Sequence, residues 1–185
     1  MMIRPAKEAD IDAIMPIVAK IKTEYFEKND IPQWTGGYPS EDVFFDDLDA
    51  GKLFVLSHED LVIGFASIGF DPEPDYAKID GNWPNEAPYA VIHRVGIDPE
   101  WHGFGFGGNF LTMAEKLCAQ RGIENIRADT HRRNAAMKKT MEDAGFQLCG
   151  VITLEGTDEA DPLRDAYQKI LLPAPETAPS KAHRH

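Results

Sequence analysis

Apolar residues near the start of the chain recur at helical spacing. Between residues 10 and 26 they lie three or four positions apart, which is the pattern of one buried helix face. The residues that set this pattern are Ile11, Ile14, Met15, Val18, Ile21, Tyr25 and Phe26. Pro16 lies inside it and predicts a kink or a break, because proline lacks the backbone N–H that a helix interior needs. A second helix is predicted over 40–50, begun by Ser40 and ended by Gly51.

The rest of the chain alternates between short apolar runs and helical patterns. Runs at 52–57 and 61–70 flank His58-Glu59-Asp60 and predict a hairpin. The segment 71–88 holds four prolines and predicts a long loop, which in a compact domain is usually functional or mobile. The remaining predicted strands are 2–6, 89–97, 123–130, 146–154 and 166–172, and the remaining predicted helices are 108–121 and 134–144.

This order of seven strands and four helices predicts a mixed α/β fold with a central sheet. A chain of 185 residues suits one domain, which we place at 1–172. The hydrophobic share of 43% and the charged share of 27% are normal for a domain with a real core. The segment 173–185 has no apolar face and is predicted to be a disordered tail.

The formal net charge of -12 argues against nucleic acid as a partner, because phosphate binding needs clustered Lys and Arg. It fits a small cationic acceptor such as an amine, which an acidic surface attracts. The first residues do not resemble a signal peptide, and no apolar run approaches the roughly 20 residues that span a bilayer. A cytoplasmic protein without a membrane partner is expected. The two cysteines lack metal-ligand spacing, so no metal site is predicted.

A glycine-rich turn at 103–108 carries the strongest chemical signal. Four glycines in six residues follow a predicted strand and open a helix. Glycine lets the backbone approach a ligand closely, and a helix N-terminus adds partial positive charge. The turn therefore predicts a phosphate cradle. The alternative is a flexible loop that merely precedes the helix.

Two other phosphate motifs have to be considered. Gly103, Gly105 and Gly108 match the dinucleotide pattern G-x-G-x-x-G, with Asp129 near the expected distance. Against this, residues 98–102 separate the strand from the first glycine, and the unit lies in the middle of the chain rather than opening a doubly wound sheet. A Walker A loop is excluded, because no Gly-Lys-Ser/Thr follows.

The turn and the segments after it resemble the GNAT acetyltransferases. H-G-F-G-F-G at 102–107 resembles the family's R/Q-x-x-G-x-G/A, with His102 in place of the usual Arg or Gln. N-x-x-M-x-x-x-M-x-x-x-G-F at 134–146 resembles N-x-x-A-x-x-x-Y-x-x-x-G-F, and R-D-A-Y-Q-K at 164–169 resembles the last strand. The resemblance implies a central, mostly antiparallel seven-stranded sheet with helices on both faces. Its fourth and fifth strands, 89–97 and 123–130, would be parallel and splayed.

The resemblance also implies where acetyl-CoA, the co-substrate, binds. Pantetheine would pair with the strand near Val95 and Ile97, and the Val95 N–H would act as an oxyanion donor. The pyrophosphate would rest on the amides of 103–108, and Asn134 would reach the pantetheine arm or the sulfur. The implied cofactor-binding residues are Val95, Gly96, Ile97, His102, Gly103, Phe104, Gly105, Phe106, Gly107, Gly108 and Asn134.

The implied reaction is direct acetyl transfer from the thioester to a primary amine in a ternary complex. The family often places a glutamate base at the position of Val91, and His93 lies two residues on, on the same strand face. Histidine suits a base at neutral pH, although a hydrogen-bonded core role explains His93 as well. The family's tyrosine acid corresponds to Met141, so another donor is needed or the thiolate leaves unassisted. Candidate donors are Tyr167, which we favour, Tyr89 and His131.

Four aromatic residues are placed to line the acceptor pocket that the resemblance implies. Aromatic rings bind either an apolar body or a cation, and anchoring of loops explains them equally well. Arg94 is expected on the strand face opposite His93, in a structural ion pair. Asp129 is expected to position His131, to bind an ammonium group or to act as a cap. The four aromatic residues are Trp34, Tyr38, Trp83 and Tyr89.

Several function classes stay open at this point. The leading one is a small-molecule N-acetyltransferase, followed by a protein or peptide N-acetyltransferase. A non-catalytic acyl-CoA sensor would explain the absent glutamate and tyrosine, and a dinucleotide oxidoreductase would bind NAD instead of CoA. The apolar edge of the last strand favours a homodimer and an intramolecular pairing equally.

Overall fold

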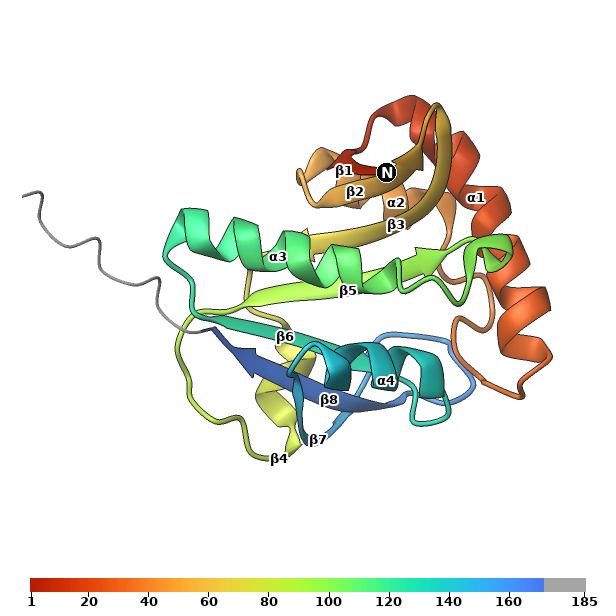
Figure 1. Cartoon of the computed structure of the whole chain (residues 1–185). Coiled ribbons are helices and arrows are strands. Elements are labelled where there is room, and N and C mark those ends of the chain that lie inside the picture. The colour runs from red at the N-terminus through yellow and green to blue at the C-terminus, as the bar shows by residue number, and fades with distance from the viewer. Residues whose placement is uncertain (172–185) are drawn as a thin grey trace, which may run out of the picture.

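Eight strands form one sheet in the order β1-β2-β3-β5-β6-β8-β7-β4, in a computed structural model that describes residues 1–171 (Figure 1). Within these residues the one parallel pair is β5 with β6, and every other pair is antiparallel. The strands are β1 (Met2–Pro5), β2 (Leu53–His58), β3 (Leu61–Gly69), β4 (Asp80–Gly81), β5 (Ala90–Ile97), β6 (Asn125–Thr130), β7 (Gln147–Thr153) and β8 (Leu163–Ile170).

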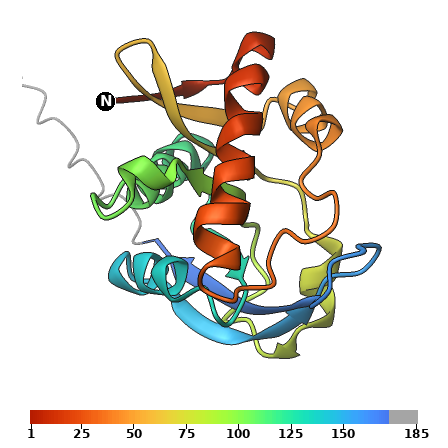
Figure 2. The ribbon, with the colours of Figure 1, turned by 90° about the vertical axis from the view of Figure 1, so that its right-hand side faces the viewer.

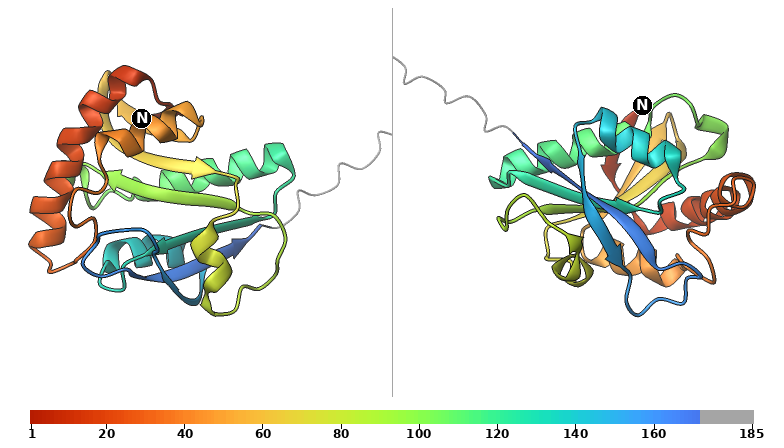
Figure 3. Two further views of the ribbon diagram at one scale, coloured as in Figure 1. Left: turned by 180° about the vertical axis from the view of Figure 1, so that it is seen from behind. Right: turned by 90° about the horizontal axis from the view of Figure 1, so that it is seen from below.

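Helices cover both faces of this sheet. The helices α3 (Gly107–Arg121) and α4 (Ala135–Asp143) lie on the face turned to the viewer in Figure 1, and α1 (Ile11–Lys20) and α2 (Glu41–Asp49) lie on the other (Figure 3, left). The shorter helical segments are η1 (Glu8–Asp10), η2 (Ile21–Glu27), η3 (Pro74–Lys78) and η4 (Pro99–Trp101). In the part of the chain that the structure describes, no helix has the length and apolar character that crossing a membrane requires.

The sheet separates two apolar layers. Side chains alternate along β3, so that Phe65 packs with α1 and α2 while Ala66 packs under α3. Both side chains are fully buried. Because helices cover both faces of the sheet, β2 and β3 carry mostly apolar side chains on both faces. The amphipathic faces of α1 and α3 thus find their partners on opposite sides of the same strands, which fixes the sheet between them.

The predicted mixed fold is confirmed, but the strand count of seven is wrong. β4 lies inside the segment predicted as a loop, where Asp80 and Gly81 pair with Val151 and Gly150 of β7. A strand of two residues has no periodicity that a sequence could reveal. The parallel splayed strands are therefore the fifth and sixth. The end of the predicted domain at 172 and the predicted tail 173–185 lie outside the described residues.

A kink or a break was predicted at Pro16, and the helix does not break there. α1 continues through Pro16 and passes directly into η2, a π-helical segment, so that the two form one long helical rod beside the sheet (Figure 2). The wider winding of a π-helix changes the direction in which side chains point, and such segments are frequent at functional sites. Tyr25 lies on this segment.

The parallel strands part before they end. β5 and β6 pair from Ala90–Ile126 to Ile92–Ala128, yet β5 continues to Ile97 and β6 to Thr130. Pairing with β3 changes register at the same place, from Ser67–His93 to Phe65–Gly96. Two residues of β5 thus face one of β3, which is a β-bulge, and Arg94 adopts a left-handed φ of 51° there. Splay and bulge together open the middle of the sheet.

Candidate active site

Two cavities meet where the strands part. One, of about 210 Å³, lies against the glycine-rich turn and is called the turn cavity here. The other, of about 480 Å³, lies between η3, β5 and the segment 154–159 and is called the acidic cavity. Four residues line both: Gln33, Trp34, Arg94 and Asp129. The two cavities therefore share a wall at the splay.

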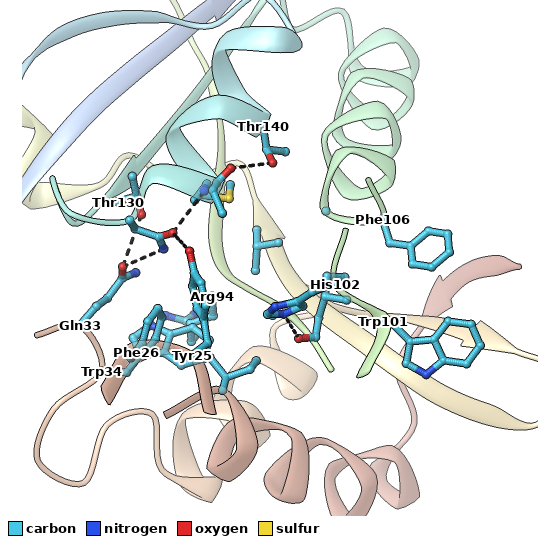
Figure 4. Close-up of a pocket in the computed structure, with 18 of the residues that line it drawn as sticks. Tyr25, Phe26, Gln33, Trp34, Arg94, Trp101, His102, Phe106, Thr130 and Thr140 are labelled. Carbon is cyan, nitrogen blue, oxygen red and sulfur yellow. Dashed lines mark hydrogen bonds between the residues drawn. The ribbon is translucent and has the colours of Figure 1, made fainter. Parts of the chain in front are cut away.

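The turn cavity is bounded by the end of β5, the glycine-rich turn and the start of α4 (Figure 4). Gly103 and Gly105 have φ values of 86° and 76°, which favour glycine. The Gly108 N–H donates to the Gly105 carbonyl at 3.1 Å, which closes the turn onto the first residues of α3. The backbone amides and the N-terminus of a 15-residue helix together form the kind of site that binds phosphate.

Nine of the eleven predicted cofactor-binding residues line the turn cavity, and two do not. Phe104 is 68% exposed and stacks on Phe106 at 5.7 Å, and Gly108 lies one residue inside α3. His102 lines the cavity in a particular way, because its Nε2–H donates to the Ile97 carbonyl at 2.7 Å. The histidine therefore braces the turn against the strand that precedes it.

A polar network closes the end of the turn cavity where α4 begins. The Asn134 side chain caps α4 by accepting from the Met137 N–H at 3.2 Å. The Tyr25 hydroxyl donates to the same Asn134 oxygen at 2.9 Å, and the Asn134 amide donates to Gln33 at 3.1 Å (Figure 4). Burial raises the pKa of Tyr25, so its hydroxyl stays protonated at neutral pH. Nothing in the sequence pattern indicated Tyr25 or Gln33 as site residues.

His93 lies at the inner end of the acidic cavity between two carboxylates. Its Nε2 lies 3.1 Å from Glu73 Oε2, and its Nδ1 lies 4.0 Å from Asp129 Oδ2. The hydrogen bond with His93 lowers the pKa of Glu73, while burial raises it by less, so Glu73 is ionised and can only accept. Nε2 must then carry the proton in the neutral ring, which leaves the lone pair on Nδ1 facing Asp129. The Tyr76 hydroxyl donates to Asp129 at 2.6 Å.

The ion pair predicted for Arg94 is confirmed, but its predicted direction is wrong. The guanidinium contacts Asp47 at 2.6 and 2.8 Å and donates to the Tyr38 hydroxyl at 2.9 Å. Arg94 nevertheless lines the acidic cavity together with His93. The bulge is the reason, because a left-handed residue in a strand interrupts the alternation of side chains.

The four predicted acceptor-site aromatics divide into two pairs. Trp34 lines both cavities and Tyr38 lines the acidic cavity. Trp83 and Tyr89 line neither, because their rings sandwich the Arg127 guanidinium at 4.0 Å on each side. They support the site indirectly, because the Tyr89 hydroxyl accepts from the Glu73 N–H at 2.9 Å. Trp83 and Tyr89 were predicted to contact the acceptor. In the structure they instead hold η3 by hydrogen bonds to Tyr76 and Glu73.

The structure separates Tyr167 from both cavities. β8 turns its side chain into the fully buried layer under α3 and α4, and its hydroxyl donates to Glu142 at 3.3 Å. Burial, followed by the charge of Glu142, raises the pKa of Tyr167 to about 12. His131 is also buried, and its Nε2–H donates to Asp161 at 2.7 Å, so Asp129 does not position it. Neither candidate faces the site, so either another group donates the proton or the thiolate leaves unassisted.

The comparisons with known proteins identify the family. The family model "Acetyltransferase (GNAT) family" matches residues 17–146. A GNAT-family acetyltransferase from Streptococcus agalactiae is 28% identical, with a TM-score of 0.81 over 92% of this chain and 95% of its own. A search of curated proteins finds no match.

Two further solved structures share the fold and contain a cofactor. YncA from Salmonella typhimurium, solved with acetyl-CoA, is 20% identical, with a TM-score of 0.66 over 96% of this chain and 98% of its own. PaiA N-acetyltransferase from Thermoplasma acidophilum, solved with coenzyme A, is 17% identical, with a TM-score of 0.66 over 91% and 98%. Together with the family match, which covers most of the chain, these findings show that the chain belongs to the acetyltransferase (GNAT) family.

Proposed function

We propose that this protein transfers the acetyl group of acetyl-CoA to a primary amine of a small-molecule acceptor, by direct attack in a ternary complex. The observation that carries the proposal is the meeting of two cavities at the splay, with Asp129 and Arg94 in both walls. Acetyl-CoA occupies the turn cavity and the amine occupies the acidic cavity. The volume of about 480 Å³ falls in the range of roughly 300–1,000 Å³ typical of small-molecule sites.

The backbone binds and polarises the donor. The amides of 103–107 and the N-terminus of α3 hold the pyrophosphate, and the pantetheine lies along the end of β5. The bulge at Arg94 removes Val95 from the regular alternation, and its N–H is the donor for the thioester oxygen as negative charge develops there. One such preorganised donor typically contributes about 2.7–4 kcal/mol to the transition state.

His93 is the general base of the proposed reaction. The acceptor ammonium binds beside Asp129 and loses a proton to Nδ1 of His93, while Glu73 holds the opposite nitrogen. The free amine attacks the thioester carbonyl carbon, and a C–N bond forms. The tetrahedral intermediate then breaks its C–S bond, and its nitrogen gives up a second proton, which balances the proton that the CoA thiolate receives. The products are the neutral amide and the CoA thiol.

Tyr25 is the proton donor to the departing thiolate. Its protonated hydroxyl lies in the turn cavity beside Asn134, on the donor side of the splay. Replacing Tyr25 by phenylalanine keeps the ring and its edge-on contact with His102 at 5.3 Å. We expect kcat to fall about tenfold, below the roughly 10²- to 10⁴-fold usual for general acid catalysis because a thiolate is a good leaving group, while KM for acetyl-CoA changes less than about twofold. Steady-state kinetics measures both, and an unchanged kcat would mean that the thiolate leaves without this proton.

The cofactor class is tested by thermal shift with acetyl-CoA, CoA and NAD side by side. A ligand at 100 times its dissociation constant stabilises the fold by about 2.7 kcal/mol, which is readily measured. We expect a shift with both CoA species and none with NAD. Release of the CoA thiol is then followed with small amines and, in a separate arm, with peptides. Binding of acetyl-CoA without turnover of any acceptor would favour a sensor, and turnover of peptides alone would favour a peptide N-acetyltransferase.

A further inference from the structure

One aromatic side chain stands where the turn cavity meets the acidic cavity. β5 lines the turn cavity from Ile97, which His102 ties to the glycine-rich turn, back to Arg94 at the splay. Of the four residues that line both cavities, Gln33, Arg94 and Asp129 are polar, and Trp34 is the apolar one. An acyl chain that reaches the splay therefore has Trp34 as its apolar neighbour.

The Trp34 ring is packed against two other aromatic rings. It is 6% exposed, meets Phe26 edge-on at 5.4 Å and stacks against Phe65 at 6.2 Å. Figure 4 shows Phe26 and Trp34 together, away from Trp101 and Phe106 at the glycine-rich turn. The ring cannot move back from the cavity without losing these core contacts.

The backbone of Trp34 is held by the segment between β7 and β8. Its φ of 56° lies in the left-handed region, which a bulky residue rarely adopts. Its N–H donates to the buried Glu159 carboxylate at 2.5 Å, and Glu159 pairs with the buried Arg164 at 2.8 Å. Strained residues persist only where the surrounding structure fixes them, and they are frequent where a protein clamps a ligand. The fold itself thus sets the position of the ring at the splay.

The core beneath the end of β5 has no space for a longer acyl chain. A Cβ at Gly96 would lie 2.4 Å from the Phe65 ring and 2.9 Å from the Ile21 side chain, so the strand already touches the core there. Ile21 and Phe65 belong to the same buried cluster as Trp34. In a core packed to this density, one added methylene group is enough to force neighbours apart. Extra length would have to displace Trp34.

The acidic cavity does not offer a longer chain an equivalent space. Glu73 and Asp129 lie there on either side of His93, at 3.1 and 4.0 Å from its ring nitrogens. Methylene groups beside these carboxylates would remove water from them without offering a hydrogen bond, which costs free energy. The apolar surface of Trp34 is therefore the favourable end point for the acyl chain.

We propose that Trp34 determines the length of the acyl chain that the protein accepts, because its ring contacts the methyl group of acetyl-CoA and excludes a butyryl chain. This inference rests on the proposed function, from which it takes the position of acetyl-CoA in the turn cavity. The identity of the acceptor does not enter it. In a fixed apolar pocket, one methylene group changes selectivity by roughly 10- to 200-fold.

The test is calorimetric titration with CoA, acetyl-CoA and butyryl-CoA in the absence of an acceptor. We expect the wild-type protein to bind butyryl-CoA about tenfold or more weakly than acetyl-CoA. In Trp34→Ala, the ratio of the two dissociation constants should fall to about one, while Kd for CoA, which has no acyl chain, changes less than about twofold. A site that is merely loosened would weaken the binding of all three ligands together and keep the ratio.

Two further variants complete the test. Trp34→Leu keeps an apolar side chain against Phe26 and Phe65, so it decides the inference if the alanine variant does not fold. We expect its ratio to fall about threefold, since leucine frees only part of the space. Trp83→Leu removes a ring of the same size that lines neither cavity and should keep the wild-type ratio.

The outcomes separate this inference from the proposed function. Equal affinities of the wild-type protein for acetyl-CoA and butyryl-CoA would overturn the inference, and so would variants of Trp34 that keep the wild-type ratio. Either result would leave transfer to an amine standing. If acetyl-CoA binds but no amine is acetylated, the proposed function falls, and the ratio of dissociation constants still decides the role of Trp34.

Discussion

Replacing His93 by alanine lowers kcat/KM for the amine by about 10²- to 10⁴-fold, the range that general base catalysis contributes. The variant removes the nitrogen that faces Asp129 and leaves the turn cavity intact, because His93 lines only the acidic cavity. The thermal shift with acetyl-CoA is therefore unchanged. Steady-state kinetics over a range of pH measures the loss, and any acidic limb that remains in the pH profile for kcat/KM comes from the acceptor ammonium, which must still lose a proton before it attacks.

Glu73→Gln is the matched companion of this variant. The amide keeps a hydrogen-bond partner near Nε2 of His93 but removes the negative charge and presents either an oxygen or an NH₂ group. We expect a smaller loss than in His93→Ala, together with a displaced acidic limb, because Glu73 positions the histidine and touches no reacting atom. A normal rate in His93→Ala would show that another group takes the proton and would remove His93 from the mechanism.

The donor half of the site was largely predictable from the sequence. Four glycines before a helix predicted a turn that lets the backbone approach a ligand, and Gly103 and Gly105 line the turn cavity at positive φ. The run 89–97 also predicted the strand that borders it, because its first residues, Ala90, Val91 and Ile92, are apolar and buried on both faces. These are local signals, in which the residue and its consequence lie close together along the chain.

The acceptor half depended on contacts that the sequence hides. Glu73 comes from a proline-rich segment without periodicity, and it contacts His93 at 3.1 Å. The segment is held by hydrogen bonds of Trp83 to the Tyr76 carbonyl and of the Glu73 N–H to the Tyr89 hydroxyl. From the sequence alone, the rings of Trp83 and Tyr89 resemble ligand-binding groups, but in the structure they pack on the Arg127 guanidinium. The pairing of such distant residues depends on tertiary packing, for which neither spacing nor composition is a guide.

Two backbone irregularities explain the remaining errors. Alternation along a strand predicts opposite directions for neighbours, and one left-handed residue, Arg94, brings its side chain and that of His93 to the same cavity. In a regular α-helix, positions 21 and 25 would share the core-facing side, whereas the π-helical winding of η2 brings the Tyr25 hydroxyl to Asn134. The sequence favoured Tyr167 as the proton donor for the same reason, since nothing in the pattern marked the irregular helix.

Replacing Arg164 by methionine destabilises the fold by about 3–5 kcal/mol, the usual cost of removing one partner of a buried ion pair. The side chains of Arg164 and Glu159 are 3% and 2% exposed and contact one another at 2.8 Å. Methionine fills much of the space of the arginine stem but leaves the Glu159 carboxylate without its cation. Urea denaturation monitored by tryptophan fluorescence measures the loss as a lower midpoint.

The double variant Glu159→Gln/Arg164→Met distinguishes two free energies. One is the cost of leaving the buried Glu159 carboxylate without a cation, and the other is the net contribution of the ion pair to stability. The neutral amide that replaces the Glu159 carboxylate can still accept from the Trp34 N–H. The hydrogen bond between the segment 155–160 and the loop that contains Trp34 therefore persists without a buried charge. We expect most of the lost stability to return, since a buried pair replaced as a unit costs far less than a broken one. If the double variant is as unstable as Arg164→Met, then the arginine stabilises the segment through its bonds to the Asp161 and Leu163 carbonyls instead. Because residues 154–159 line the acidic cavity, we expect the single variant also to raise KM for the acceptor while KM for acetyl-CoA stays constant.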